Sequence, residues 1–212
     1  MLTVKRFIFN PIQENTYVVY HGKDACAVID PGCYFAEEKQ SLATWLKESH
    51  LHPNLLLNTH CHLDHVFGNK WVAEQYLLEL QMGEKELWTF RMAPESGMRW
   101  SMPFENYAGN IIFLKEGDKV NMGDDSLEVF FTPGHSPGHI VFYNRKQGFV
   151  ISGDLLFRMG IGRSDLPGGD AALLLESIHQ KLMVLPDDTI VYPGHGEPTT
   201  IGYEKENNPF LI

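Results

Sequence analysis

The stretch Thr59-His60-Cys61-His62-Leu63-Asp64-His65 brings three imidazoles and one carboxylate into six consecutive residues. Side chains of these two kinds together suit zinc, iron or manganese. His60 and His62 are two residues apart, so a bend in the backbone lets both face one ion while Asp64 and His65 turn toward a second. A polar loop whose histidines only form hydrogen bonds is the alternative, and so dense a group of ligands disfavours it.

The apolar run Leu55-Leu56-Leu57 leads directly into this stretch. It predicts a buried strand that delivers the ligands at its carboxyl end. A second apolar run, residues 25–29, ends in the same way at Asp30-Pro31-Gly32. Taken alone, this Asp-Pro-Gly sequence is most simply an ordinary turn.

The same pattern recurs further along the chain, where an apolar run stops, a Gly or Pro turn follows, and a His or Asp stands at the junction. The residues at these later junctions are His135, Asp154 and His195. Strand ends gathered on one rim of a sandwich would bring all these side chains together. Five histidines and two aspartates then suffice for two metal ions that share a bridging carboxylate and keep positions open for hydroxide and substrate.

The chain has 212 residues, 43% of them hydrophobic, so we expect one domain (1–212) with a sizeable core. Its formal net charge of -10 disfavours nucleic acid and anionic membrane as partners, since both bind basic faces. The three cysteines form no CxxC pair, which is typical of reduced thiols. The first ten residues do not resemble a signal peptide, and no run is long enough for a membrane span. These features predict a soluble, cytoplasmic protein.

Residues 2–9 and 16–20 predict a starting hairpin, and helical spacing of apolar residues predicts helices over 36–49, from 69 toward 80, and from Asp170 to Pro186. Glycines and prolines punctuate residues 81–110, which we expect to be the least regular part of the chain. Their many Met and aromatic residues suit either an excursion over the mouth of the active site or a loop that pads the core.

The motifs together resemble the metallo-β-lactamase superfamily, from Val28-Ile29-Asp30-Pro31-Gly32 through the histidine stretch, Pro-Gly-His135, Ser-Gly-Asp154 and Pro-Gly-His195-Gly to Asn208-Pro209-Phe210. Within it, Asp154-Leu-Leu-Phe, Gly162-Arg163-Ser164-Asp165 and Thr200-Ile201-Gly202-Tyr203-Glu204 look like the short, single-domain bacterial type of glyoxalase II-like hydrolase. The resemblance implies an α/β fold: a four-layer αββα sandwich with metals at the rim between two mixed sheets.

The resemblance also implies the ligand sets. One metal is held by His60, His62 and His135, a second by Asp64, His65 and His195, and Asp154 bridges the two. Asp30 then corresponds to a carboxylate that orients a ligand histidine. The motif positions leave Cys61 and His139 without a ligand function. Arg163 stands where the family has a lysine that contacts substrate, whereas Asp165 and Glu197 stand where it has tyrosines.

The implied activity is hydrolysis of a hydroxyacyl thioester such as S-lactoylglutathione by a hydroxide that bridges two divalent ions, most simply zinc, with iron or manganese as alternatives. Asp64 would orient that hydroxide. The partner is then a small-molecule thioester. Only 17 residues follow His195, so the C-terminal helical domain with which two-domain relatives bind glutathione is not expected.

The main alternative is the persulfide dioxygenase of the same scaffold, which uses a single iron. Its last motif usually reads Pro-Ala-His-Asp, whereas this chain has Pro-Gly-His195-Gly. A true β-lactamase usually has a cysteine at the position of Asp154. A non-enzymatic module would need broken ligands, and all seven are intact.

Overall fold

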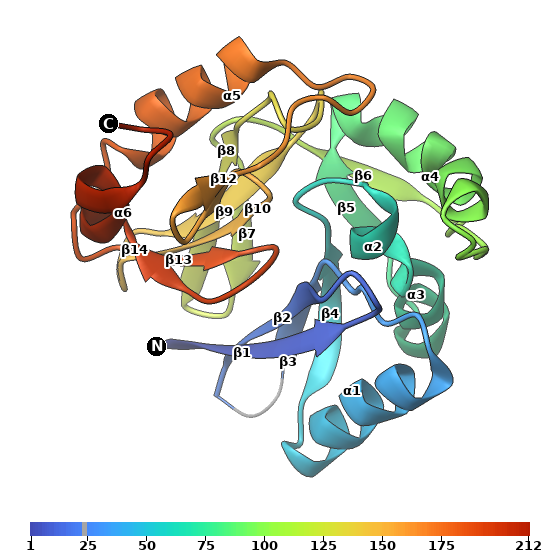
Figure 1. The fold of residues 1–212 in the computed structure, drawn as a ribbon. Helices are drawn as coiled ribbons and strands as arrows, with labels where there is room; N and C mark the ends of the chain where they lie inside the picture. Colours follow the sequence, from blue (N-terminus) through green and yellow to red (C-terminus); the bar gives the residue numbers. More distant parts are fainter. Residues whose placement is uncertain (23–24) are drawn as a thin grey trace.

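Two six-stranded sheets pack face to face, and helices cover the outer face of each sheet (Figure 1). The structure is a computed structural model that describes residues 1–22 and 25–212. The layers follow the order helix, sheet, sheet, helix, which confirms the predicted αββα arrangement of mixed sheets.

The first sheet has the order β1-β2-β3-β4-β5-β6. Its strands are β1 (Leu2–Phe9), β2 (Glu14–His21), β3 (Ala25–Ile29), β4 (His52–Leu57), β5 (Leu80–Gly83) and β6 (Ile111–Leu114). The first two form the predicted antiparallel hairpin, and β3 to β6 run parallel to one another. The helical elements that follow or cross over between these strands are α1 (Ala36–Glu48), α2 (Leu63–Val66), α3 (Asn69–Tyr76), the 3₁₀ turn η1 (Glu84–Glu86) and α4 (Leu87–Arg99).

The second sheet has the order β14-β13-β10-β9-β8-β7. Its strands are β7 (Lys119–Met122), β8 (Asp125–Phe131), β9 (Ile140–Asn144), β10 (Phe149–Gly153), β13 (Ile190–Pro193) and β14 (Thr199–Thr200). A small hairpin, β11 (Leu156–Phe157) with β12 (Gly160–Ile161), follows β10. The helical elements are α5 (Ala171–Ser177), the π-helical turn η2 (Ile178–Leu182) and α6 (Ile201–Asn207).

Alternation along the strands divides the apolar side chains among three cores. On β2, Tyr17 and Val19 face the core between the two sheets, whereas Val18 faces the core under the helices. Leu57 and Leu56 of β4 divide in the same way. This two-residue period is that of a strand buried on both faces, so each sheet can be covered by a second sheet on one side and by helices on the other.

The carboxyl ends of several strands open at one rim of the sandwich. The stretch after β4 carries residues 58–65, Asp154 directly follows β10, and His195 follows β13, which is parallel to β10. The loop between β8 and β9 reaches the same rim, since Ile140 donates its backbone N–H to the carbonyl of Thr59 at 2.9 Å. The packing of the two sheets therefore decides which polar side chains meet.

Residues 81–110 correct one prediction from the sequence, because they hold a strand and a 13-residue helix, α4, in place of an irregular excursion. Pro94 lies inside α4 and cannot donate to the carbonyl of Phe90 one turn earlier. The side-chain amide of Asn106 donates to that carbonyl instead, at 2.6 Å. A distant residue thus compensates for the helix-breaking proline, and local sequence patterns do not reveal such a partner.

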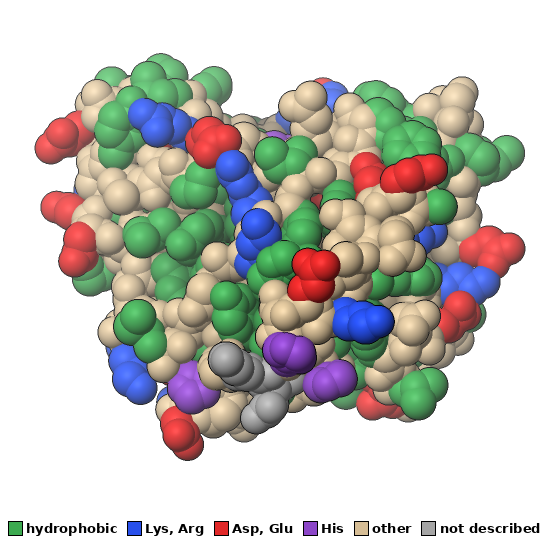
Figure 2. Space-filling model, turned by 90° about the horizontal axis from the view of Figure 1, so that it is seen from below, with side chains coloured by type: hydrophobic (Ala, Val, Ile, Leu, Met, Phe, Trp, Pro, Cys, Tyr) green, Lys and Arg blue, Asp and Glu red, His purple; other side chains and the backbone are tan. Residues whose placement is uncertain are grey.

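One face of the molecule is drawn in Figure 2, where basic, acidic and hydrophobic side chains are interspersed. Lys and Arg side chains do not gather into one field on this face. Over residues 1–22 and 25–212, no helix has the length and apolarity that crossing a membrane requires.

Replacing Leu56 with Ala tests the core beneath the helices. Leu56 is fully buried, so we expect Leu56→Ala to lower the free energy of unfolding of the metal-free protein by about 2–5 kcal/mol. Leu77→Ala is the matched control, because Leu77 is 91% exposed and the substitution also removes a leucine side chain beyond Cβ. Urea unfolding followed by circular dichroism measures both; equal losses would contradict the described burial.

Candidate metal centre

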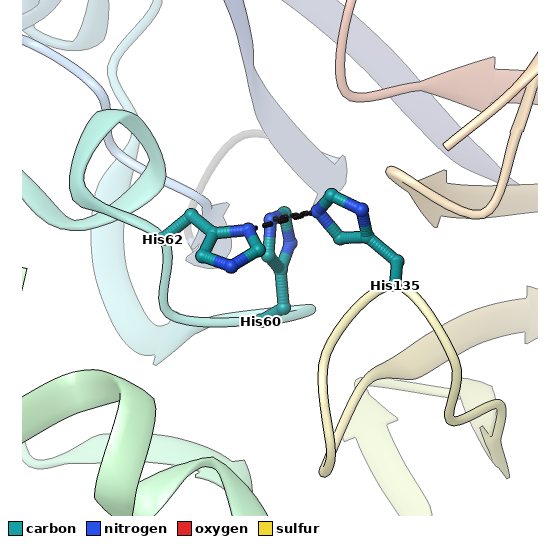
Figure 3. A group of neighbouring side chains, drawn as sticks. All are labelled: His60, His62 and His135. Atoms are coloured by element: carbon teal, nitrogen blue, oxygen red, sulfur yellow. Dashed lines mark hydrogen bonds between the residues drawn. The ribbon is translucent and has the colours of Figure 1, made fainter. Parts of the chain in front are cut away.

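Three histidines converge at the rim from two loops. His60 and His62 lie between β4 and α2, and His135 lies between β8 and β9, with all three rings pointing toward one another (Figure 3). Nε2 of His135 is 2.8 Å from Nδ1 of His62 and 3.2 Å from Nε2 of His60. One nitrogen from each ring lies within 4.8 Å of the other two, which is the spacing of ligands around one ion.

A second group lies beside the first and consists of Asp64, His65 and His195. Asp64 and His65 occupy the first turn of the short helix α2, and His195 follows β13. Oδ2 of Asp64 is 3.1 Å from Nε2 of His195 and 3.6 Å from Nε2 of His65. The histidine stretch is therefore divided between two groups, which is the division predicted from its spacing.

Asp154 lies between the two groups. Its Oδ1 is 3.4 Å from Nε2 of His65, and its Oδ2 is 3.5 Å from Nε2 of His135 and 3.6 Å from Nε2 of His195. Gly194 makes this approach possible, since a Cβ at that position would lie 2.1 Å from Oδ1 of Asp154. The carboxylate thus contacts both groups, and the structure brings together all seven side chains that the sequence singles out as ligands.

The buried polar atoms of this cluster fit a cation. Nε2 of His65 and Oδ1 of Asp154 are buried and have no hydrogen-bond partner within the described part of the chain. Buried polar groups normally have a partner, and buried charges are paired or coordinate metals. Imidazole nitrogens and carboxylate oxygens are the ligands of divalent transition metals. The His/Asp cluster therefore implies that the protein binds divalent metal.

The electrostatics of the two groups differ. Burial, reinforced by His135, lowers the pKa of His62 to about 3, and burial also lowers the pKa values of His60 and His135. These imidazoles are neutral near neutral pH, as metal ligation requires. Burial alone would lower the pKa of His65, but Asp64 and Asp154 outweigh it and raise that pKa well above its usual range. The second group thus has the more negative surroundings.

Asp30 contacts two residues of the histidine stretch, His65 and Thr59. Its Oδ2 lies 3.2 Å from Nδ1 of His65, the ring nitrogen opposite the one that faces Asp154, and accepts a hydrogen bond from Oγ1 of Thr59 at 2.6 Å. Thr59 in turn lies 3.1 Å from Nδ1 of His60. Asp30 also belongs to a close group with His60 and His65.

Glu86 is a buried carboxylate that the sequence did not reveal as part of the site. Its Oε2 accepts from the backbone N–H of Cys61 at 2.9 Å, and its Oε1 accepts from Gly138 N at 2.8 Å and from Ser136 Oγ at 2.5 Å. These bonds tie the loop of His60 and His62 to the loop of His135. In Gly83-Glu84-Lys85-Glu86, neighbouring charges make Glu86 look like a surface residue, so no local signal distinguishes it.

Glu14 is a second buried carboxylate that sequence patterns missed. It is fully buried, accepts from Oγ1 of Thr16 at 2.9 Å and lies 3.9 Å from Nδ1 of His65. Burial raises the pKa of Glu14 well above its ordinary value. Its neighbour Asn15 donates to the carbonyl of Gly196 at 2.8 Å, so the start of β2 also holds the loop of His195.

The sequence also drew attention to Cys61, His139 and Arg163, whose side chains lie outside the two ligand groups. The Sγ atom of Cys61 contacts Met82, and His139 is fully buried with Nδ1 2.9 Å from Oγ1 of Thr132. The backbone carbonyl of Arg163 accepts from Nδ1 of His135 at 2.7 Å, so Nε2 of that ring faces the centre. The guanidinium of Arg163 forms a two-point ion pair with Asp165 at 2.7 and 2.8 Å.

Comparison with known proteins assigns the family. Residues 9–195 match the metallo-beta-lactamase superfamily, a span that includes every residue of the cluster. The chain belongs to the metallo-beta-lactamase superfamily. It is 37% identical over 201 residues to a Haemophilus influenzae protein named hydroxyacylglutathione hydrolase GloC, across 94% of this chain and 93% of that one. As a member of the superfamily, it is a metallo-hydrolase.

Two solved structures share the fold closely. BLEG-1, described as a B3 metallo-beta-lactamase, is 38% identical and superposes with a TM-score of 0.90 over 99% of this chain and all of that one. TTHA1623 in a di-iron-bound form is 36% identical, with a TM-score of 0.90 over 98% of this chain and 100% of its own. Both likenesses extend through the rim that carries the cluster.

Replacing Glu86 with Gln tests whether the link between the two ligand loops matters. The side-chain amide of Gln has one oxygen that can still accept from a backbone N–H. Its NH2 group is itself a donor and would face the other backbone N–H, so one of the two loops loses its hydrogen bond to residue 86. We expect Glu86→Gln to lower metal affinity about 10–100-fold, as for other groups that orient ligands. The exposed neighbour Glu84→Gln is the control. Competition with a chromogenic chelator measures affinity, and equal values for the two variants would refute the link.

Proposed function

We propose that this protein is a thioesterase that hydrolyses acyl thioesters with two divalent metal ions. The observation that carries the proposal is the position of Asp154, whose Oδ1 lies near His65 and whose Oδ2 lies near both His135 and His195, so that it touches both groups. A carboxylate in this position suits a bridge between two ions. The name of the GloC relative supports a thioester as the substrate.

In the proposed arrangement, each group holds one ion and Asp154 touches both. The ligands of the first ion are His60, His62 and His135, and those of the second are Asp64, His65 and His195. We propose zinc as the metal; iron and manganese suit the same ligand types, and the di-iron form of TTHA1623 belongs to a relative. When bound, the ions supply polarisation of the carbonyl and a lowered pKa for the attacking water.

The protein's own groups position the reactants. Burial by itself raises the pKa of Asp64, but His65 and His195 outweigh it, so that the pKa lies below its usual value and the carboxylate is ionised. An ionised Asp64 can orient the attacking water by accepting a hydrogen bond from it. As the C–S bond breaks, sulfur leaves as a thiolate, which is stable enough to need no strong general acid because thiols have a pKa of about 8.5.

We propose Arg163 as a contact for the polar end of the substrate. It lines the cavity beside the cluster, and its side chain is 52% exposed. The pair with Asp165 limits its charge, so its contribution is that of a hydrogen-bonding group at the mouth. Asp30, which contacts His65 and Thr59, is proposed to orient the ligand histidines without touching substrate.

Replacing Asp154 with Ala tests the bridge. We expect Asp154→Ala to lose bound metal and to reduce thioester hydrolysis to the buffer rate, because both ions lose a shared ligand. Asp188→Ala, at an exposed position, is expected to keep wild-type metal content and rate. Elemental analysis and a thiol-release assay measure the two properties; an active, metal-replete Asp154→Ala would refute the bridging assignment.

A substrate panel tests the reaction class on metal-analysed wild-type protein. Lactoylglutathione, acyl-CoA and acyl thioesters of small thiols are compared with a β-lactam, since BLEG-1 is described as a metallo-beta-lactamase. A persulfide with an oxygen electrode tests the single-iron dioxygenase alternative. We expect thiol release without oxygen uptake. Stoichiometric oxygen consumption, or turnover of the β-lactam alone, would contradict the thioesterase proposal.

A further inference from the structure

The cavity over the metal cluster is lined mainly by apolar side chains. It has a volume of about 650 Å³ and opens onto five of the seven clustered side chains. Helix α4 supplies Trp88, Met92 and Ala93 to its wall, and the β11–β12 hairpin supplies Phe157 and Ile161. Cavities of this size accommodate a small organic molecule, and apolar walls bind its apolar part.

Two tryptophans that line this cavity are not packed into the hydrophobic core. Trp88 is 49% exposed and Trp100 is 60% exposed, although both line the cavity. The two side chains stand at opposite ends of α4 (Leu87–Arg99), so exposed aromatic surface borders the cavity along the length of that helix, as is common at ligand pockets. Their exposure at the mouth of the reaction centre therefore points to a ligand surface.

Both arginines that line the cavity are paired with a carboxylate. Arg163 pairs with Asp165, and the other lining arginine, Arg99, pairs with Glu95 at 2.5 Å. Each guanidinium thus has a carboxylate beside it, and neither pair adds net positive charge to the wall. A charged substrate tail would find little attraction inside the cavity, whereas an apolar one would replace water favourably.

We propose that this cavity binds the acyl group of the substrate, and that this group is an apolar aliphatic or aromatic chain rather than a small hydroxyacyl. The proposal rests on the thioesterase function above. Biological carrier thiols are polar and charged, so the apolar part of a natural thioester is its acyl group. The thiol then leaves through the polar mouth at Arg163.

A chain-length series tests this assignment. Acetyl, butanoyl, hexanoyl, octanoyl and lactoyl thioesters of N-acetylcysteamine keep the thiol constant and uncharged. We expect kcat/KM to rise about fourfold per buried methylene until the cavity is full. The kcat/KM of the lactoyl thioester should be close to the values of the short-chain thioesters. Equal kcat/KM values across the series, or a clear preference for lactoyl, would overturn the proposal while leaving the thioesterase standing.

Two methionines of α4 give a matched pair of variants. Met92 lines the cavity, whereas Met98 lies on the same helix, is 67% exposed and does not line it. We expect the octanoyl-to-acetyl ratio of kcat/KM to fall several-fold in Met92→Ala and to stay at the wild-type value in Met98→Ala. Equal effects of the two substitutions would contradict a binding function for this wall.

A binding measurement separates this proposal from the proposed reaction. S-octyl-N-acetylcysteamine, a thioether that cannot be hydrolysed, should change the fluorescence of Trp88 and Trp100, and the S-ethyl thioether at equal concentration should not. The Trp88→Phe variant should reduce the change. If the octyl thioether binds but no thioester is hydrolysed, the proposed reaction is refuted and the acyl pocket stands. If the octyl thioether does not bind, the acyl pocket is refuted.

Discussion

The contact between Asp154 and His65 joins the two sheets at the rim that carries the His/Asp cluster. His65 lies in α2, just after β4 of the first sheet, whereas Asp154 directly follows β10 of the second, and their nearest atoms are 3.4 Å apart. Apolar side chains between the sheets, among them Tyr17, Leu57 and Phe142, hold this separation. Because interiors pack densely, a small change in the inter-sheet core would move one half of the ligands relative to the other.

Five carboxylates are buried around this contact: Glu14, Asp30, Asp64, Glu86 and Asp154. Buried charge is unfavourable unless hydrogen bonds or opposite charges offset it. Backbone N–H and hydroxyl groups satisfy Asp30 and Glu86, but Oδ1 of Asp154 and Oε1 of Glu14 have no hydrogen-bond partner among the described residues. Divalent cations would offset the remaining charge, so metal binding and folding are expected to stabilise each other.

The sequence could predict which side chains meet at the rim, because they cluster after the apolar run Leu55–Leu57 or stand at the junctions after later apolar runs. The family resemblance that these motifs carry predicted the αββα sandwich. Helix α4 could not be predicted, because Pro94 is tolerated only through Asn106, which lies outside the helix. Glu86 was missed for a related reason: its partners Cys61 and Gly138 are distant in sequence. Local patterns reveal which residue types can bind metal, but contacts across the fold decide what orients them.

The proposed function requires that two ions share the carboxylate of Asp154. X-ray absorption spectroscopy of protein loaded with zinc tests it most directly, because scattering between metals reports their separation. We expect two zinc ions per chain with a metal–metal distance of about 3.5–4 Å and a mixed nitrogen and oxygen ligand shell. One ion per chain, or two without metal–metal scattering, would contradict it.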